Sequence, residues 1–223
     1  MKPLLIRAFM LVAVFSGVLS AGASWANVIS FEQAPVNGGL ALFDDTGGFS
    51  FADDFSLATS TDLSEISWWG GYAGNALPSS SDFTISIYSD SGGKPGSVVT
   101  SYSPAAVGRT LTGLTGNDLT STPESIYEFT YALPSVLTLT PGATYYLSII
   151  DNTSAISSWL AGTGNGSSFV GDPSSNLWAA QSRDFAFELS SPAVVPEPTS
   201  MVILGGLISG LFVTRKLRRK NQL

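Results

Sequence analysis

The 223-residue sequence contains no cysteine and no histidine. Without cysteine, no disulfide can stabilise the fold and no thiol can act as a nucleophile. Without histidine, Ser-His-Asp and Cys-His catalysis and histidine-ligated zinc sites are excluded. These two absences exclude several of the common enzyme mechanisms before any motif is considered.

Cations are scarce in the central part of the chain. Between residues 27 and 191 the only cations are Lys94, Arg109 and Arg183, against sixteen acids, which gives a net charge of −13. The whole-chain charge of −7 conceals this, because the other basic residues lie near the two ends. An acidic surface repels the phosphates of nucleic acids and anionic lipids. We therefore expect cations or neutral glycans as partners, and no nucleic acid.

The first 26 residues have the pattern of a secretory signal peptide. Lys2 and Arg7 form a positive start, residues 8–19 are apolar, and Ser24-Trp25-Ala26 places small residues at positions −3 and −1 of a cleavage site. The pattern predicts export, with a mature protein that begins at Asn27.

The C-terminal thirty residues combine three features. A proline-bracketed acid, Pro196-Glu197-Pro198, ends a Pro-rich linker at 192–200. The run 201–214 carries no charge and is followed by a basic tail at 215–223, whose cations are Arg215, Lys216, Arg218, Arg219 and Lys220. A helix of this length spans only about 20 Å, but flanking cations stay in the cytoplasm and can snorkel, so a short span suffices. We therefore predict a transmembrane helix at 201–214.

This combination resembles the PEP-CTERM sorting signal of Gram-negative bacteria. The matching residues are Val195-Pro196-Glu197-Pro198, the apolar run and the terminal basic cluster. The resemblance implies recognition by an exosortase, a membrane-embedded processing enzyme, at the inner membrane. The body would then be delivered to the cell surface, the outer membrane or the extracellular matrix. An ordinary C-terminal membrane anchor is the alternative.

Residues 27–191 show the two-residue alternation of half-buried β-strands, and no amphipathic helical period. Clear examples are residues 83–88, 127–131, 145–149 and 185–189. Shorter runs follow the same template at 28–31, 49–57, 63–69, 98–102, 136–139 and 157–160. Turn-forming clusters at 89–96, 140–142 and 162–166 separate them. About nine to eleven short strands predict one all-β domain, an antiparallel β-sandwich of jelly-roll-like type.

The body also resembles, loosely, the β-sandwich modules that often precede this sorting signal. The residues concerned are Ala52-Asp53-Asp54-Phe55, the segment 66–72, and Phe83 to Tyr88 before Gly93-Lys94-Pro95-Gly96. Those modules mostly have no assigned activity, so the resemblance supports the fold rather than a function.

Two acid pairs are candidate calcium ligands. Calcium takes six to eight oxygen ligands, and loops of exported sandwiches often supply them. Asp44, Asp45, Asp53 and Asp54, together with Asp184, would converge if the first and last strands were neighbours. The alternative is that these are solvated loop acids, since no EF-hand spacing is present. No other cofactor is predicted.

Aromatic residues are candidates for sugar contacts, because sugar rings stack on flat, exposed aromatic faces. Trp69, Tyr72 and Trp159 are the candidate glycan-binding residues. Consecutive residues of a strand point to opposite faces, and Trp68 shares the parity of Ile66. We therefore expect Trp68 inside and Trp69 outside. The alternative is that most of these aromatics pack in the core.

No motif for catalysis is present. Glycoside hydrolysis would need a pair of carboxylates, yet Glu65, Glu128 and Glu188 have outward parity in predicted strands. The sequence therefore favours a non-catalytic surface or matrix protein associated with exopolysaccharide or biofilm. A carbohydrate-binding module is the second hypothesis, and a glycan-cleaving enzyme is the third.

Overall fold

The computed structural model describes residues 27–43, 50–118, 122–173, 175 and 177–193. The predicted signal peptide, the Pro196-Glu197-Pro198 motif, the predicted transmembrane helix and the basic tail lie outside the described residues. Within the described part, no helix is both long and apolar enough to cross a membrane. Apart from a single 3-10 turn, η1 (Ala73–Asn75), the regular structure of this part consists of β-strands.

Thirteen strands follow one another along the described chain. They are β1 (Val28–Gln33), β2 (Ala41–Phe43), β3 (Ser50–Ser56), β4 (Thr61–Tyr72), β5 (Phe83–Asp90), β6 (Pro95–Tyr102), β7 (Gly108–Asn117), β8 (Pro123–Leu139), β9 (Thr144–Asp151), β10 (Ser157–Leu160), β11 (Ser168–Asp172), β12 (Leu177–Gln181) and β13 (Phe187–Ser191).

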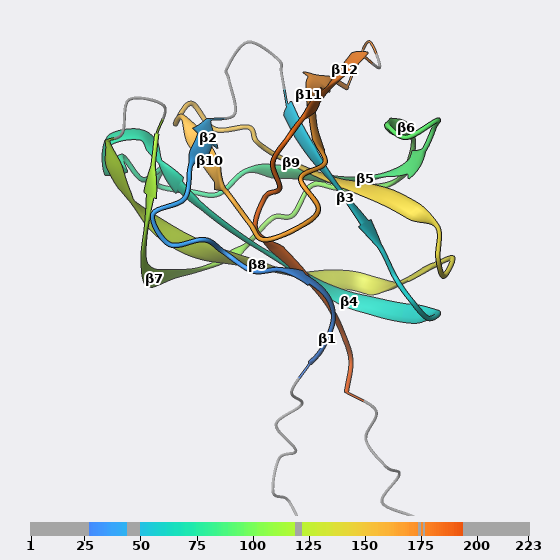
Figure 1. The fold of residues 1–223 in the computed structure, drawn as a ribbon. Helices are drawn as coiled ribbons and strands as arrows, with labels where there is room; N and C mark the ends of the chain where they lie inside the picture. The colour runs from blue at the N-terminus through green and yellow to red at the C-terminus, as the bar shows by residue number, and fades with distance from the viewer. Residues whose placement is uncertain (1–26, 44–49, 119–121, 174, 176, 194–223) are drawn as a thin grey trace, which may run out of the picture.

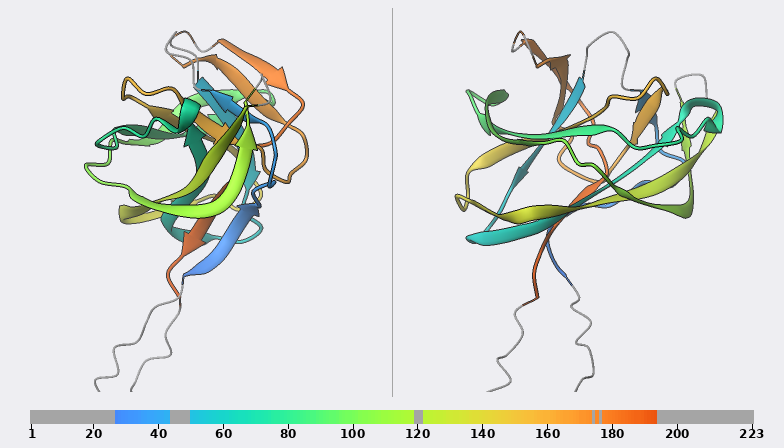
Figure 2. Two further views of the ribbon diagram at one scale, coloured as in Figure 1. Left: turned by 90° about the vertical axis from the view of Figure 1, so that its left-hand side faces the viewer. Right: turned by 180° about the vertical axis from the view of Figure 1, so that it is seen from behind.

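The strands form two antiparallel sheets that face one another (Figure 1). The first sheet has the order β1-β13-β4-β10-β2, and its long strand β4 also pairs with β8, which pairs with β7. The second sheet has the order β12-β11-β3-β9-β5-β6. Two further views show that the first sheet curls strongly along β8 (Figure 2). The predicted all-β architecture of two packed antiparallel sheets is confirmed.

An aromatic core fills the space between the sheets. Trp68 lies nearly parallel to Phe129, with ring centroids 5.3 Å apart, and meets the edge of Phe83 at 5.1 Å. Alternate residues of the facing strands are buried with them, including Ile85 and Leu147. Each such side chain contributes roughly 1.5–3 kcal/mol when it is fully buried. The predicted alternation in β4, β5, β9 and β13 is therefore the pattern that builds the core.

Turns occur where the sequence predicted them. In the β5–β6 turn, Gly92 and Gly93 have φ angles of 69° and 80°, a region that side chains disfavour. The Ser91 N–H donates to the carbonyl of Lys94 and closes this turn at 2.9 Å. The other two predicted turn clusters separate β8 from β9 and β10 from β11.

The predicted number of strands is too low for the described chain. The runs at 127–131 and 136–139 belong to one long strand, β8, and the sequence analysis missed β2, β7, β11 and β12. Most side chains of β7 and β12 are exposed or half-buried on both faces, so neither strand shows the alternation of a half-buried strand.

The two ends of the domain lie together. Val28, the first residue of β1, pairs with Ser191, the last residue of β13. Figure 1 shows both strands reaching the same pole of the molecule, opposite the β11–β12 hairpin. The first and last strands are therefore neighbours, as the predicted convergence of the aspartates requires.

Replacing Phe187 tests the core directly. Phe187 is fully buried and contacts the rings of Phe31, Phe55 and Trp159. Phe187→Ala should lower the free energy of unfolding by about 3–5 kcal/mol, because it leaves a cavity at the junction of the two sheets. Urea denaturation of the full chain in mild detergent measures the change. Val98→Ala, at a position on β6 that is 54% exposed, is the control and should change stability by less than about 0.5 kcal/mol.

Candidate functional site

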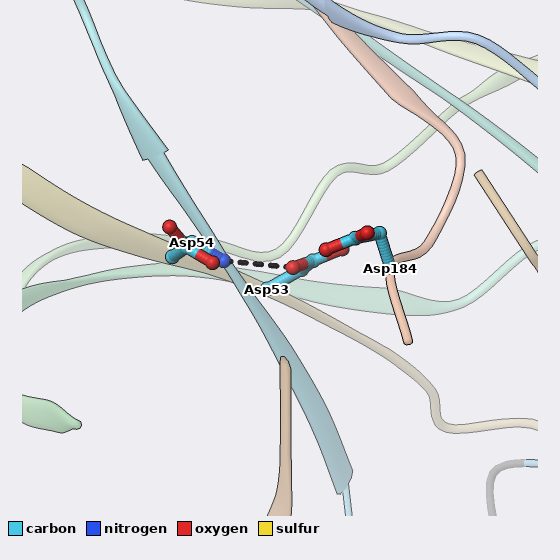
Figure 3. Close-up of side chains that lie close together, drawn as sticks. All are labelled: Asp53, Asp54 and Asp184. Atoms are coloured by element: carbon cyan, nitrogen blue, oxygen red, sulfur yellow. Dashed lines mark hydrogen bonds between the residues drawn. The ribbon is translucent and has the colours of Figure 1, made fainter. Parts of the chain in front are cut away.

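Three aspartates converge between β3 of the second sheet and the segment that leads into β13 of the first sheet. Asp53 and Asp54 belong to β3, and Asp184 lies in the segment that leads into β13. One carboxylate oxygen of each lies within 4.8 Å of the others. Figure 3 shows Asp53 and Asp184 extending toward each other from these two segments. Of the predicted calcium ligands, Asp53, Asp54 and Asp184 therefore come together, whereas Asp44 and Asp45 lie outside the described residues.

Asp53 joins the second sheet to the first. It is fully buried, and it shares the inner face of its sheet with its cross-strand partner Leu147. One carboxylate oxygen accepts the N–H of Phe185 at 2.5 Å, and the other accepts the N–H of Asp54 at 2.9 Å. Burial raises the pKa of Asp53 to about 8; the nearby charges of Asp184 and Asp54 add to this, and the backbone hydrogen bonds oppose it.

Asp184 holds the loop between β10 and β11. Its carboxylate accepts the N–H groups of Gly166 at 2.6 Å and Ser167 at 3.0 Å. The loop lies so close that a Cβ at Gly164 would come within 2.5 Å of the Asp184 carboxyl carbon. Glycine at position 164 is therefore required by this close approach, rather than by a turn conformation.

Asp54 is the most accessible of the three aspartates. It is half-buried, and its Oδ2 accepts a hydrogen bond from the side chain of Asn165 at 3.1 Å. Its Oδ1 is buried, and no described group hydrogen-bonds to that oxygen. Burial raises the pKa of Asp54, the Asn165 hydrogen bond lowers it, and the charge of Asp184 raises it.

Two further buried polar side chains adjoin the aspartates. The Gln33 side chain of β1 donates from Nε2 to the Asp54 carbonyl at 3.2 Å, while its Oε1 is buried and has no partner among the described residues. Ser168, fully buried, lies directly opposite Asp53 in the β3–β11 pair, and within the described structure its hydroxyl also has no partner. A surface hollow of about 230 Å³ opens beside Gln33, Asp54 and Asn165.

The arrangement concentrates negative charge where water is largely excluded. Three carboxylates this close cannot all be ionised at low energetic cost. Two species relieve the repulsion: a proton on Asp53, or a cation held by the carboxylate oxygens. All candidate metal ligands at this point are oxygen atoms, which suit a hard cation such as calcium better than zinc, for which nitrogen and sulfur ligands are typical.

The structure buries all three predicted glycan-binding residues. Trp69, Tyr72 and Trp159 are buried, with exposed fractions of 8%, 1% and 5%. Trp68 is inside, as predicted, and Trp69 does point to the opposite face. The prediction that Trp69 is exposed is wrong, because a second apolar cluster covers that face, formed with Ala41, Ile126, Leu160 and Ala186.

The polar atoms of the other two aromatics are also engaged inside the protein. The Tyr72 hydroxyl donates to Asp151 at 2.9 Å, and Trp159 Nε1 donates to the carbonyl of Ala186 at 2.9 Å. Trp159 also stacks on Phe185 with a centroid distance of 4.8 Å. None of the three offers the free ring face that stacking on a sugar requires.

The three strand glutamates do lie on the outer face of the first sheet. Glu128 is opposite Trp69, and Glu188 is opposite Ser67. Glu65, Glu128 and Glu188 are nevertheless half-buried rather than fully solvated. Burial raises the pKa of Glu128, and the charges of Glu188 and Glu65 raise it further.

Comparison with known proteins gives a family but no activity. The family model "Domain of unknown function (DUF7901)" matches residues 29–202. The chain belongs to this family. Neither a curated protein nor a solved structure matches the sequence. The matched region begins at Ile29, the second residue of β1, and includes the rest of the two-sheet domain. The aspartate site therefore lies wholly inside the DUF7901 domain.

Gln33, Asn165 and Ser168 of the DUF7901 domain are neighbours of the aspartates that no sequence pattern predicted. These residues approach Asp54 and Asp53 only through the pairing of β3 with β11 and the contact of β1 with β3. The only sequence signal nearby is the glycine-rich cluster at 162–166, which predicted a turn but not its contact with Asp184.

The raised pKa of Asp53 predicts a pH dependence of stability for the DUF7901 domain. With a folded-state pKa of about 8 against the ordinary 3.8, the folded protein binds more protons than the unfolded chain between these values. The free energy of unfolding should therefore fall as pH rises from about 5 to about 8, by at most ~1.4 kcal/mol per pH unit, and level off above. Urea denaturation across this range, in buffer free of divalent cations, measures it.

Asp53→Asn removes the titrating group and should flatten this profile, with a lower overall stability, because its amide nitrogen replaces one of the two oxygens that accept backbone N–H groups. Asp62→Asn removes the same charge at an exposed position and is the control, which should keep the wild-type slope. A wild-type stability that rises over this pH range would contradict the assignment.

Proposed function

We propose that the DUF7901 domain is displayed at the surface of a Gram-negative bacterium as a non-catalytic matrix protein. In this proposal the signal peptide at 1–26 directs export. An exosortase then recognises Pro196, Glu197 and Pro198, together with the apolar run at 201–214 and the basic residues 215–220, at the inner membrane. The body is delivered to the outer surface, where it associates with exopolysaccharide or biofilm.

The adjacent ends of the domain are the structural observation that best supports this proposal. Val28 pairs with Ser191, so the domain begins and ends at the same pole. In the sequence, the predicted signal peptide comes just before this pole and the predicted linker just after it. A domain attached at one pole leaves the rest of its surface free for contacts. In Figure 1 the β11–β12 hairpin lies at the opposite pole.

The fold is also compatible with a finer classification as jelly-roll-like. The chain passes repeatedly from one sheet to the other, as in the successions β3-β4-β5 and β8-β9-β10-β11. We propose this class because jelly rolls place successive strands in opposing sheets. Many binding and surface domains of unrelated function share such sandwiches, so the class itself assigns no activity.

Residue chemistry supports the non-catalytic part of the proposal. Histidine and cysteine are absent from the sequence, and the buried carboxylates of Asp53 and Asp184 accept backbone N–H groups. The net charge of −13 in residues 27–191 favours neutral polymers over nucleic acid as partners. The burial of Trp69, Tyr72 and Trp159 removes the residues on which the carbohydrate-binding module hypothesis depended.

The sorting motif is tested by its combined replacement. In a host that carries an exosortase system, the wild-type protein should lose its C-terminal segment and leave the inner membrane. Pro196→Ala/Glu197→Ala/Pro198→Ala should keep its full mass and remain in the inner membrane, because the extended, charged recognition segment is gone. Fractionation and intact-mass measurement report both results.

Pro192→Ala, which changes a proline of the linker outside the motif, is the matched control and should be processed as the wild type is. Identical mass and location of the wild type and the triple variant would identify the segment as an ordinary membrane anchor. That result would remove the main support for display in the matrix.

A further inference from the structure

We propose that Asp53, Asp54 and Asp184 form a calcium site that fastens the segment before β13 and the β10–β11 loop to β3. The three side chains present oxygen atoms within 4.8 Å of one another, at a point where both sheets of the domain meet. Asp53, Asp54 and Asp184 were all candidates in the sequence, and the structure adds Gln33 and Ser168 beside them, while Asp44 and Asp45 lie outside the described residues.

The first support beyond the acids themselves comes from Ser168. Its side chain is 0% exposed, and it lies on the same face as Asp53 because the two residues pair directly. Among the described residues nothing hydrogen-bonds to its hydroxyl. An unpaired buried hydroxyl costs roughly 1–3 kcal/mol. A cation beside Asp53 would take this oxygen as a ligand and remove the cost.

Gln33 gives the second, independent support. It is 3% exposed, and its Nε2 bond to the Asp54 carbonyl holds the carboxamide against the aspartates. The Oε1 atom of the same group is buried with no partner in the described chain, as is Asp54 Oδ1. Ser168, Gln33 and Asp54 thus each carry a buried oxygen atom with no partner among the described residues, although buried polar atoms are normally paired.

The composition of the site selects the ion. The candidate ligands are carboxylate, carboxamide and hydroxyl oxygens, the set that calcium accepts in six- to eight-fold, irregular coordination. Magnesium requires a stricter octahedral geometry with shorter bonds and keeps several waters. The hollow beside Gln33, Asp54 and Asn165 gives the ion and its remaining waters access from solvent.

The bound ion would join segments that are far apart in the sequence. Asp53 already accepts the N–H of Phe185, and Asp184 accepts those of Gly166 and Ser167. Neutralising these carboxylates removes their mutual repulsion without breaking the bonds to the backbone. Calcium should therefore raise the stability of the whole domain, because it binds the folded form and has no assembled site in the unfolded chain.

Calcium titration of the full chain in mild detergent tests the proposal. After chelation and desalting, about 5 mM CaCl2 should raise the Tm by about 2–9 °C, since extracellular calcium modules bind at about 10⁻⁴–10⁻³ M. The same concentration of MgCl2 should give a clearly smaller shift. Calorimetric titration should show saturable calcium binding, and terbium, a luminescent calcium substitute, should be displaced by calcium.

Asp54→Asn should lose the calcium-induced shift and weaken binding at least about tenfold, because it removes the charge of the ligand with the unused oxygen. Ser168→Ala removes a neutral ligand, should weaken binding a few-fold, and decides the question if Asp54→Asn does not fold. Asp62→Asn, at an exposed position with the same change in charge, should bind as the wild type does.

Three results would overturn the site: no calcium-induced shift in the wild type, an equal shift with magnesium, or wild-type affinity in both Asp54→Asn and Ser168→Ala. The sorting experiment has no bearing on this outcome, because it reads mass and location rather than calcium binding. Failure of one proposal therefore leaves the other standing.

Discussion

The bond from the Phe185 N–H to the buried carboxylate of Asp53 is the interaction on which the arrangement of the two sheets depends. Most of the contact between the sheets is apolar and therefore has little directional preference. A fully buried polar acceptor has one acceptable position, because misplacing it leaves it without partners. Asp53 thus specifies how the segment before β13 meets β3, while the aromatic rings around Phe187 supply the bulk of the stabilisation.

Further polar contacts link Asp53 to the β10–β11 loop and to β1. Asp184 precedes Phe185 and holds the β10–β11 loop, and that loop reaches back to Asp54 through Asn165. β1 closes the arrangement from the other sheet, because Gln33 bonds the Asp54 carbonyl. Polar groups between β3 and the segment before β13 therefore help to position a loop and both terminal strands. A cation or a proton at the aspartates would act on all of them together.

The strands with one buried face could be predicted from sequence, because Phe83, Ile85 and Ile87 alternate with polar residues on the same strand. β7 and β12 could not be predicted, because their side chains are mostly exposed or half-buried on both faces. The prediction that Trp69 points to the face opposite Trp68 was right, but the prediction that it is exposed was wrong. The residues that cover it come from β2, β8, β10 and the segment before β13, which are distant in the sequence. The aspartate site was predicted in part: the acids are visible in the sequence, but the contributions of Gln33 and Ser168 arise only from strand pairing.

If the domain is tethered at the cell surface as proposed, the position of the aspartate site affects how the domain resists force on its C-terminal end. A tether that follows Ser191 pulls on β13, which is held along its length by β1 and β4. Antiparallel ladders loaded along the strand resist through several hydrogen bonds at once. The segment before β13 is held by an isolated bridge between Phe185 and Ala161 and by a few backbone hydrogen bonds. At that segment the described structure places Asp53 and Asp184, whose bonds to the backbone anchor it to β3 and to the loop. An ion there would add to these contacts and strengthen the end of β13 that lies farthest from the tether.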